Sequence, residues 1–186
     1  MDDAKEVREF WFAQDPDQWF GPVLDDEIRT RFGALTERAA DGLLDHWADS
    51  PRRRLSLIIL LDQFPRNLYR GSPKAFAQDT RALALTLTGM QCGADAALEP
   101  VERLFFLMPL QHAESIQAQE ESVAAYRRLL EDAPPDETDL FRQALESAEA
   151  HRAVIERFGR FPHRNAALGR ESTPEEAAFI AETPDF

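Results

Sequence analysis

The sequence has 186 residues, of which 44% are hydrophobic and 30% charged, and its formal net charge is -13. This length suits one domain with a sizeable core, and the acidic balance argues against partners that need a basic surface, namely nucleic acid and anionic membranes. Cys92 is the only cysteine, the first residues MDDAKEVREF lack an apolar signal core, and no apolar run could span a bilayer. We therefore expect a single domain over residues 1–186, located in the cytoplasm.

Helix signals dominate the chain, and they predict an all-α fold. Serine or threonine precedes proline at Ser50-Pro51, Ser72-Pro73 and Thr173-Pro174, which places an N-cap oxygen before a proline at the first helical position. Apolar residues between these marks recur at helical spacing. Short connections favour a single antiparallel array of about seven to eight helices. The predicted helices cover residues 3–13, 23–41, 51–64, 73–90, 100–108, 113–131, 137–159 and 174–181.

Two segments predict where the core lies. The run from Leu55 to Leu61 is apolar on nearly every side, which is typical of a central helix covered by neighbours. Aromatic residues crowd the first predicted helix and its exit, and we expect them to pack onto the bundle. Further along, the apolar residues Phe141, Ala148 and Ile155 share one helical face.

Three proline-containing segments predict helix ends, because a helix interior rejects proline and the preceding residue leaves the helical region. We name them the FPRN elbow (residues 64–67), the PLQH elbow (109–112) and the FPHRN elbow (161–165). They end the third, fifth and seventh predicted helices. In an up-and-down array these helices run the same way, so the three elbows are expected to meet at one pole.

Polar side chains follow each elbow, and they make up the predicted ligand-binding site. Guanidinium groups bind carboxylate or phosphate bidentately, so we expect a binding module for a small anionic ligand or an acidic peptide or protein segment. The candidate residues are Asp62, Gln63, Arg66, Asn67, His112, Glu114, His151, Arg160, His163, Arg164 and Asn165.

A purely structural interpretation of the same residues stays open. Arginine, histidine and asparagine also satisfy the carbonyl groups left unpaired at helix C-termini. Asn67 and Asn165 each stand four residues before a glycine, which indicates a repeated capping turn. Asp62 needs a partner if it is buried, and either Arg66, one turn later, or an arginine of another elbow would serve.

An enzyme is the alternative function. A hydrolase or lyase could use His112, His151 or His163 with Glu114, with or without a metal ion. However, the sequence contains no HExxH, GxSxG, P-loop or GxGxxG motif. We therefore assign no catalytic residue and predict neither a cofactor nor a metal site.

Four stretches resemble the bacterial family called domain of unknown function 924. They are Phe10-Trp11-Phe12, LLDQFPRNLYRGSPKAFAQD (60–79), PLQHAES (109–115) with Gln119 and Ser122, and HRAVIERFGRFPHRNAALGRESTPEEAAFIA (151–181). The resemblance covers nearly the whole chain and implies an all-α fold similar to tetratricopeptide-repeat proteins, with no established activity. Family members commonly carry PFEHSED where this chain has PLQHAES. Gln111 and Ser115 thus stand where an acid is usual, and His112 and Glu114 remain as the matching pair.

Overall fold

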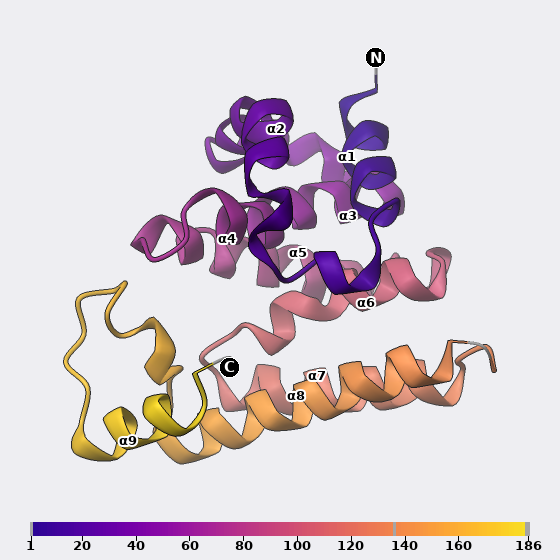
Figure 1. The fold of residues 1–186 in the computed structure, drawn as a ribbon. Helices are drawn as coiled ribbons and strands as arrows, with labels where there is room; N and C mark the ends of the chain where they lie inside the picture. The colour runs from indigo at the N-terminus through magenta and orange to yellow at the C-terminus, as the bar shows by residue number, and fades with distance from the viewer. Residues whose placement is uncertain (1, 136, 185–186) are drawn as a thin grey trace. The chain divides into compact units, whose positions relative to one another are not determined.

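The computed structural model describes residues 2–135 and 137–184, and in these residues the chain is all-helical, with no β-strand (Figure 1). The predicted fold class is therefore confirmed. Over the same residues, no helix combines the length and the apolar character needed to cross a membrane.

The helices follow the predicted order, with short 3-10 turns between them. The α-helices are α1 (Asp3–Phe12), α2 (Asp25–Ala40), α3 (Pro51–Ile58), α4 (Phe64–Leu68), α5 (Asp79–Gln91), α6 (Pro100–Gln111), α7 (Ile116–Glu131), α8 (Thr138–Phe158) and α9 (Pro174–Glu182). A π-helical turn covers Ile59–Gln63, and 3-10 turns cover Pro16–Gln18, Pro22–Leu24, Asp45–Asp49, Pro73–Phe76, Asp95–Ala97 and Pro162–Arg164.

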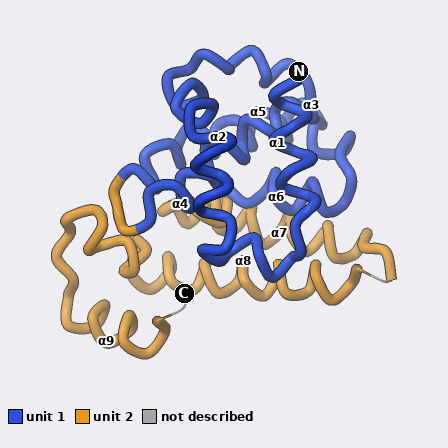
Figure 2. The backbone as a smooth tube through the Cα atoms, turned by 45° about the horizontal axis from the view of Figure 1, so that its top comes forward, with its two compact units in different colours: residues 1–70, 74–109 blue, residues 71–73, 110–186 orange. Residues whose placement is uncertain are grey.

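The chain divides into two compact units, coloured in Figure 2. The first unit comprises residues 1–70 and 74–109, and the second comprises residues 71–73 and 110–186. Each unit is described by itself below. The organisation of residues 1–186 as a single domain stays a prediction.

The core of the first unit is built around α3 and the π-helical turn. Every residue from Leu55 to Leu61 is fully buried, as predicted for a central helix. α1 and α5 pack against α3, and α2 packs against α4. The aromatic residues Trp11, Phe32 and Phe64 are also almost fully buried, and burial of each such side chain contributes about 1.5–3 kcal/mol.

The N-terminal aromatic residues divide between core and surface. Phe10, Trp11 and Trp19 lie in the core, and the Trp19 indole donates a hydrogen bond to the carbonyl of Trp11 at 2.9 Å. Phe20, by contrast, is 65% exposed. Phe12 is half-buried, and its ring centroid lies 5.5 Å from that of Phe105. The expectation that these five aromatic residues pack onto the bundle therefore holds for all but Phe20.

Two of the three predicted helix ends are wrong. At Pro65 the helical path continues: the N–H of Phe64 bonds to the carbonyl of Ile59, five residues back, and α4 then runs on to Leu68. The wider π turn makes room for a proline ring that would otherwise clash with the carbonyl four residues earlier.

The second wrong prediction is Pro109, which lies inside the last turn of α6, two residues before the helix ends at Gln111. Proline has no N–H to offer the carbonyl of Phe105. Only one helical hydrogen bond is lost, because the helix ends soon after the proline. The next carbonyl, that of Phe106, accepts a hydrogen bond from the buried hydroxyl of Thr86 at 2.8 Å.

The predicted helix over 73–90 is interrupted. Pro73–Phe76 forms a 3-10 turn, and α5 begins only at Asp79. The Ser72-Pro73 signal therefore starts a short turn rather than the long helix. The Thr173-Pro174 signal is confirmed: Thr173 and Glu176 form a complete capping box at the start of α9.

The second unit is organised by a helical hairpin. α7 and α8 lie side by side and run in opposite directions (Figures 1 and 2). The predicted inner face of α8 is buried at Phe141, Ala148 and Ile155. At its C-terminal end, a cluster built on Val154, Ile155 and Phe161 packs against partly buried side chains that include Phe179 of α9. This cluster joins α8, the FPHRN elbow and α9.

Candidate functional site

The FPHRN elbow is the one proline segment that behaves as predicted. α8 ends at Phe158, and Gly159 follows with a φ of +69°, a left-handed conformation that glycine adopts readily. Phe161 is extended, and Pro162 then starts the 3-10 turn Pro162–Arg164. The chain leaves the helix here and forms a loop, residues 159–173, that we call the corner loop.

Glu114 fastens the corner loop to the segment between α6 and α7. Its carboxylate accepts the backbone N–H of Phe161 at 2.8 Å and both terminal nitrogens of Arg170 at 2.8 and 2.9 Å. Burial alone would raise the pKa of Glu114, but these hydrogen bonds and the charges of Arg170 and Arg164 lower it below its usual value. Glu114 therefore stays ionised and is a poor proton acceptor.

A second carboxylate, that of the buried Glu176, holds the other end of the loop. Arg160 binds it bidentately at 2.6 and 2.8 Å, and the backbone N–H of Thr173 donates to it at 2.8 Å. The Asn165 amide donates to Glu176 at 3.4 Å and to Ser172 at 3.0 Å. The hydrogen bond from Arg160, followed by that from Thr173, lowers the pKa of Glu176 to about 2.

Arg164 connects the corner loop with the PLQH elbow. Its guanidinium donates to the backbone carbonyl of His112 at 3.0 Å and lies over the ring of Phe161, 4.6 Å from the centroid. Cation–π contact of this kind orients a guanidinium as well as stabilising it. Arg164 therefore has a defined position close to Glu114 and His112.

His112 and His151 also come together, with ring centroids 6.4 Å apart. The Nδ1 of His151 lies 2.8 Å from the carbonyl of Ser147, and a carbonyl can only accept, so this nitrogen carries a proton. Gln111 approaches the same nitrogen at 3.3 Å. In the neutral imidazole, Nε2 of His151 is then the basic atom.

His163 has a different environment from the other two histidines. Its Nε2 donates to the carbonyl of Thr183 at 2.6 Å, and its ring contacts Phe179 of α9 with centroids 5.5 Å apart. These contacts tie the corner loop to the last helix. They do not make His163 part of the His112–His151 pair.

The FPRN elbow has its own network in the first unit. Asp62 is fully buried and pairs with Arg66 at 3.3 Å, as predicted, and Arg66 also binds Asp79 bidentately at 3.0 Å. Burial would lower the pKa of Arg66, but the charges of Asp62 and Asp79 outweigh it and raise the pKa. Gln63 donates to Asp62 and to the sulfur of Met108.

Asn67 and Arg70 share another carboxylate of the first unit. The Asn67 amide donates to Asp25 at 2.9 Å, and Arg70 donates to the same carboxylate at 2.7 and 2.9 Å. Burial would raise the pKa of Asp25, but these two partners lower it. Most of the elbow arginines that were predicted to bind an anionic ligand thus form ion pairs with carboxylates of the protein itself.

Of the three predicted elbows, the PLQH and FPHRN elbows share contacts in the second unit: His112, Glu114, Arg164 and the corner loop meet there. The FPRN elbow belongs to the first unit. A pole shared by all three stays a prediction. Among residues 2–135 and 137–184, no three His, Cys, Asp or Glu side chains gather so that they could hold a metal ion.

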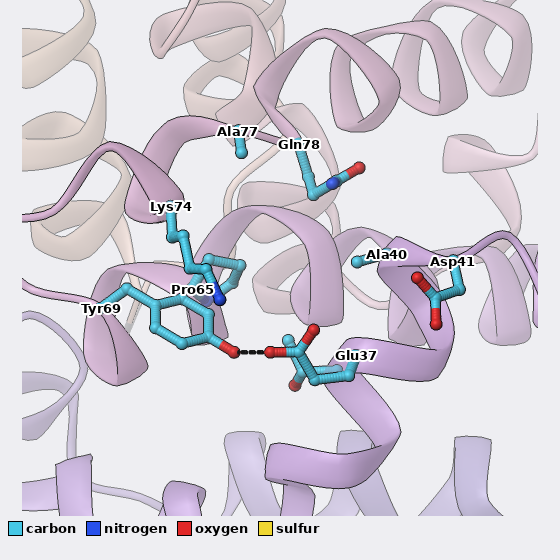
Figure 3. Close-up of a pocket in the computed structure, with 9 residues that line it drawn as sticks. Glu37, Ala40, Asp41, Pro65, Tyr69, Lys74, Ala77 and Gln78 are labelled. Carbon is cyan, nitrogen blue, oxygen red and sulfur yellow. Dashed lines mark hydrogen bonds between the residues drawn. The ribbon is translucent and has the colours of Figure 1, made fainter. Parts of the chain in front are cut away.

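A pocket in the first unit was not predicted. It has a volume of about 240 Å³ and lies between the C-terminal end of α2 and first-unit residues of the segments 65–69 and 74–78 (Figure 3). The lining residues are Thr36, Glu37, Ala40, Asp41, Pro65, Tyr69, Lys74, Ala77 and Gln78. The lining residues from Pro65 onward belong to the LLDQFPRNLYRGSPKAFAQD stretch, so this motif could have pointed to the pocket. The lining residues of α2 belong to no motif.

The fold and these turns define an all-helical protein whose loops are held by buried and half-buried ion pairs. Residues 7–184 match the family described as bacterial protein of unknown function (DUF924), and the chain belongs to this family. A solved structure of a protein of unknown function, ATU0120 from Agrobacterium tumefaciens, is similar at 37% sequence identity and a TM-score of 0.85, covering 96% of this chain and 97% of that chain. No curated protein matches the sequence.

Proposed function

We propose that the chain is a binding module for a small anionic ligand or the acidic end of a peptide, and that the ligand contacts the second unit. The site would be the histidine–arginine corner, which we define as His112, Glu114, His151, Arg164 and Arg170. The observation that carries the proposal is the charge balance there. Two guanidinium groups act on the single carboxylate of Glu114, and two imidazoles lie beside it.

This local charge contrasts with the rest of the protein. The formal net charge of the chain is -13, and an anion would be repelled from most of its surface. A carboxylate or phosphate group needs several donors with fixed directions. Arg164 supplies such donors because Phe161 and the His112 carbonyl already hold its guanidinium in place. Little side-chain entropy would then be lost on binding.

The FPRN residues would have a supporting role in this proposal. Arg66 is matched by Asp62 and Asp79, and Asn67 by Asp25. An anion would have to displace these carboxylates from buried and half-buried positions, and the cost in free energy would exceed the gain from the new contacts. A tetratricopeptide-like arrangement of the helices and a cytoplasmic location belong to the same proposal, and the exposed free thiol of Cys92 suits a reducing compartment.

Calorimetric titration with phosphate, citrate and a glutamate-rich peptide tests the proposal. We expect saturable binding that Arg164→Gln weakens about tenfold or more, since a bidentate charged contact is lost. Arg157→Gln is the matched control, because Arg157 lies in the same unit and pairs with the exposed Glu175. If no anion binds the wild type, or if Arg164→Gln lowers only the melting temperature, Arg164 is a capping residue and the proposal fails.

An enzyme is the second candidate, and His151 is the observation that favours it. Its fixed Nδ1 proton leaves Nε2 as a defined basic atom near His112. Glu114 is unsuited to the same role because its pKa is lowered. Turnover of ester or phosphomonoester substrates that is lost in His151→Gln, but kept in the exposed His46→Gln, would replace the binding proposal with a hydrolase.

A further inference from the structure

The pocket of the first unit differs from the corner in the charge that it presents. Two carboxylates, those of Glu37 and Asp41, lie one helical turn apart at the C-terminal end of α2 and line the cavity (Figure 3). The helix dipole adds negative potential at this end. Lys74 also lines the cavity and offsets part of this negative charge, but two carboxylates face one ammonium, so the pocket favours a cation, unlike the site proposed for the second unit.

In the described residues, no arginine or lysine forms an ion pair with either of these two carboxylates. Comparable acids of the first unit, such as Asp25 and Asp45, each pair with an arginine. Glu37 accepts a hydrogen bond from the hydroxyl of Tyr69, a neutral partner that leaves its charge in place. Asp41 is exposed at the pocket rim.

Tyr69 fixes the direction of the Glu37 carboxylate. Burial and the nearby carboxylate raise the pKa of Tyr69 to about 12, so its hydroxyl stays protonated and donates to Glu37 at any physiological pH. The ammonium of Lys74 lies 5.3 Å from the centre of the Tyr69 ring, on the same wall of the pocket. The cation–π contact with Lys74 therefore positions the Tyr69 ring, and the Tyr69 hydroxyl in turn orients the Glu37 carboxylate.

A separate observation concerns the hydroxyl of Thr36. Thr36 lines the pocket and is only 3% exposed, and its buried Oγ1 has no hydrogen-bond partner in the described part of the chain. Buried hydroxyl groups are nearly always paired, because leaving one unpaired costs free energy. A polar ligand in the cavity would supply the missing partner after the Thr36 side chain turns toward it, because Oγ1 is buried in the ligand-free protein.

We infer that this cavity binds a small molecule or side chain with a primary ammonium group, held by Glu37 and Asp41, with Thr36 as a further polar contact. An ammonium has three N–H donors and no acceptor, which matches two carboxylates and a hydroxyl. The volume of about 240 Å³ restricts the occupant to a short aliphatic amine or a lysine-sized chain, since sites for drug-sized ligands measure about 300–1,000 Å³. The inference is independent of the anion site.

Calorimetry and amide NMR with 1,4-diaminobutane test this inference. We expect saturable binding with shifts confined to α2 and the segments 65–69 and 74–78, and a loss of about tenfold or more in Glu37→Gln, where a direct charge contact is removed. Asp41→Asn should weaken binding less, because Asp41 is exposed. Asp26→Asn is the control: it removes one charge from the same helix, but Asp26 points to solvent and pairs with Arg29.

Two further probes separate the possible sources and exclude simple attraction. Tetramethylammonium carries the same charge without an N–H donor and should bind at least about tenfold more weakly. N-acetyl-lysine methylamide competing better than diaminobutane would identify the occupant as a lysine side chain of a protein. The absence of saturable binding by either amine, or an equal loss in Asp26→Asn and Glu37→Gln with both variants folded, would overturn the inference.

Discussion

The FPRN and FPHRN elbows have nearly the same sequence but different structures. Both contain Phe-Pro followed by Arg-Asn, and both end in a glycine with positive φ, Gly71 at +71° and Gly169 at +64°. In the first, the helix continues through the proline by a π turn. In the second, the helix has already ended at Gly159.

The difference arises from the residues that precede the proline. The residues before Pro65 form a fully buried run without glycine, and leaving the helix there would expose apolar side chains. Before Pro162, Gly159 offers a left-handed cap at little cost. Two closely similar motifs, FPRN and FPHRN, thus give a π turn in one place and follow a helix end in the other, depending on burial and on one glycine. The motif therefore does not fix the backbone by itself.

The sharpest way to break this comparison is to remove each arginine in turn. Arg66→Met should reduce the free energy of unfolding by about 3–5 kcal/mol, because it leaves the fully buried Asp62 without its guanidinium. Arg164→Met should cost only about 1–2 kcal/mol, for one hydrogen bond and a cation–π contact. Urea unfolding measures both values. Equal losses would mean that the two elbows have the same structural role.

A smaller effect is expected at the glycine that distinguishes the elbows. Gly159→Ala should lower the free energy of unfolding by about 1–2 kcal/mol, since a Cβ is strained at a φ of +69°. Nothing lies within 4 Å of the added methyl group, so the cost is conformational rather than steric. Gly33→Ala in α2 is the control: it also meets no atom, and alanine should be neutral or stabilising there. A neutral Gly159→Ala would show that the left-handed cap is not required.

The fold could be predicted from the sequence much further than the site could. Helical spacing and proline caps give the helices, the central run at Leu55–Leu61 and the pairing of Asp62 with Arg66, because these depend on neighbours in the chain. Arg160 with Glu176 and Arg170 with Glu114 are separated by 16 and 56 residues. These ion pairs depend on how the corner loop folds, and the spacing of residues along the chain does not predict them. The pocket at Glu37 was missed for the same reason.

The last test concerns acid sensitivity, which should differ between the carboxylates of the corner loop and those at the surface. The pKa of Glu176 is about 2 in the folded protein against an ordinary value of 4.5, so protonation favours the unfolded chain. Its contribution to stability is fully present above pH 4.5 and is lost as the pH falls toward 2. We expect the melting temperature of the wild type to fall across this window more steeply than that of Glu176→Gln.

Glu175→Gln is the matched control for this acid series. Glu175 is the adjacent residue, but it is exposed and pairs with Arg157 at the surface, where an ion pair contributes about 0–1 kcal/mol. Its replacement should leave the acid dependence close to that of the wild type. If Glu176→Gln and Glu175→Gln give the same dependence of melting temperature on pH, the buried Arg160–Glu176 pair does not hold the corner loop. The FPHRN elbow would then lack the stabilising ion pair that we assign to it.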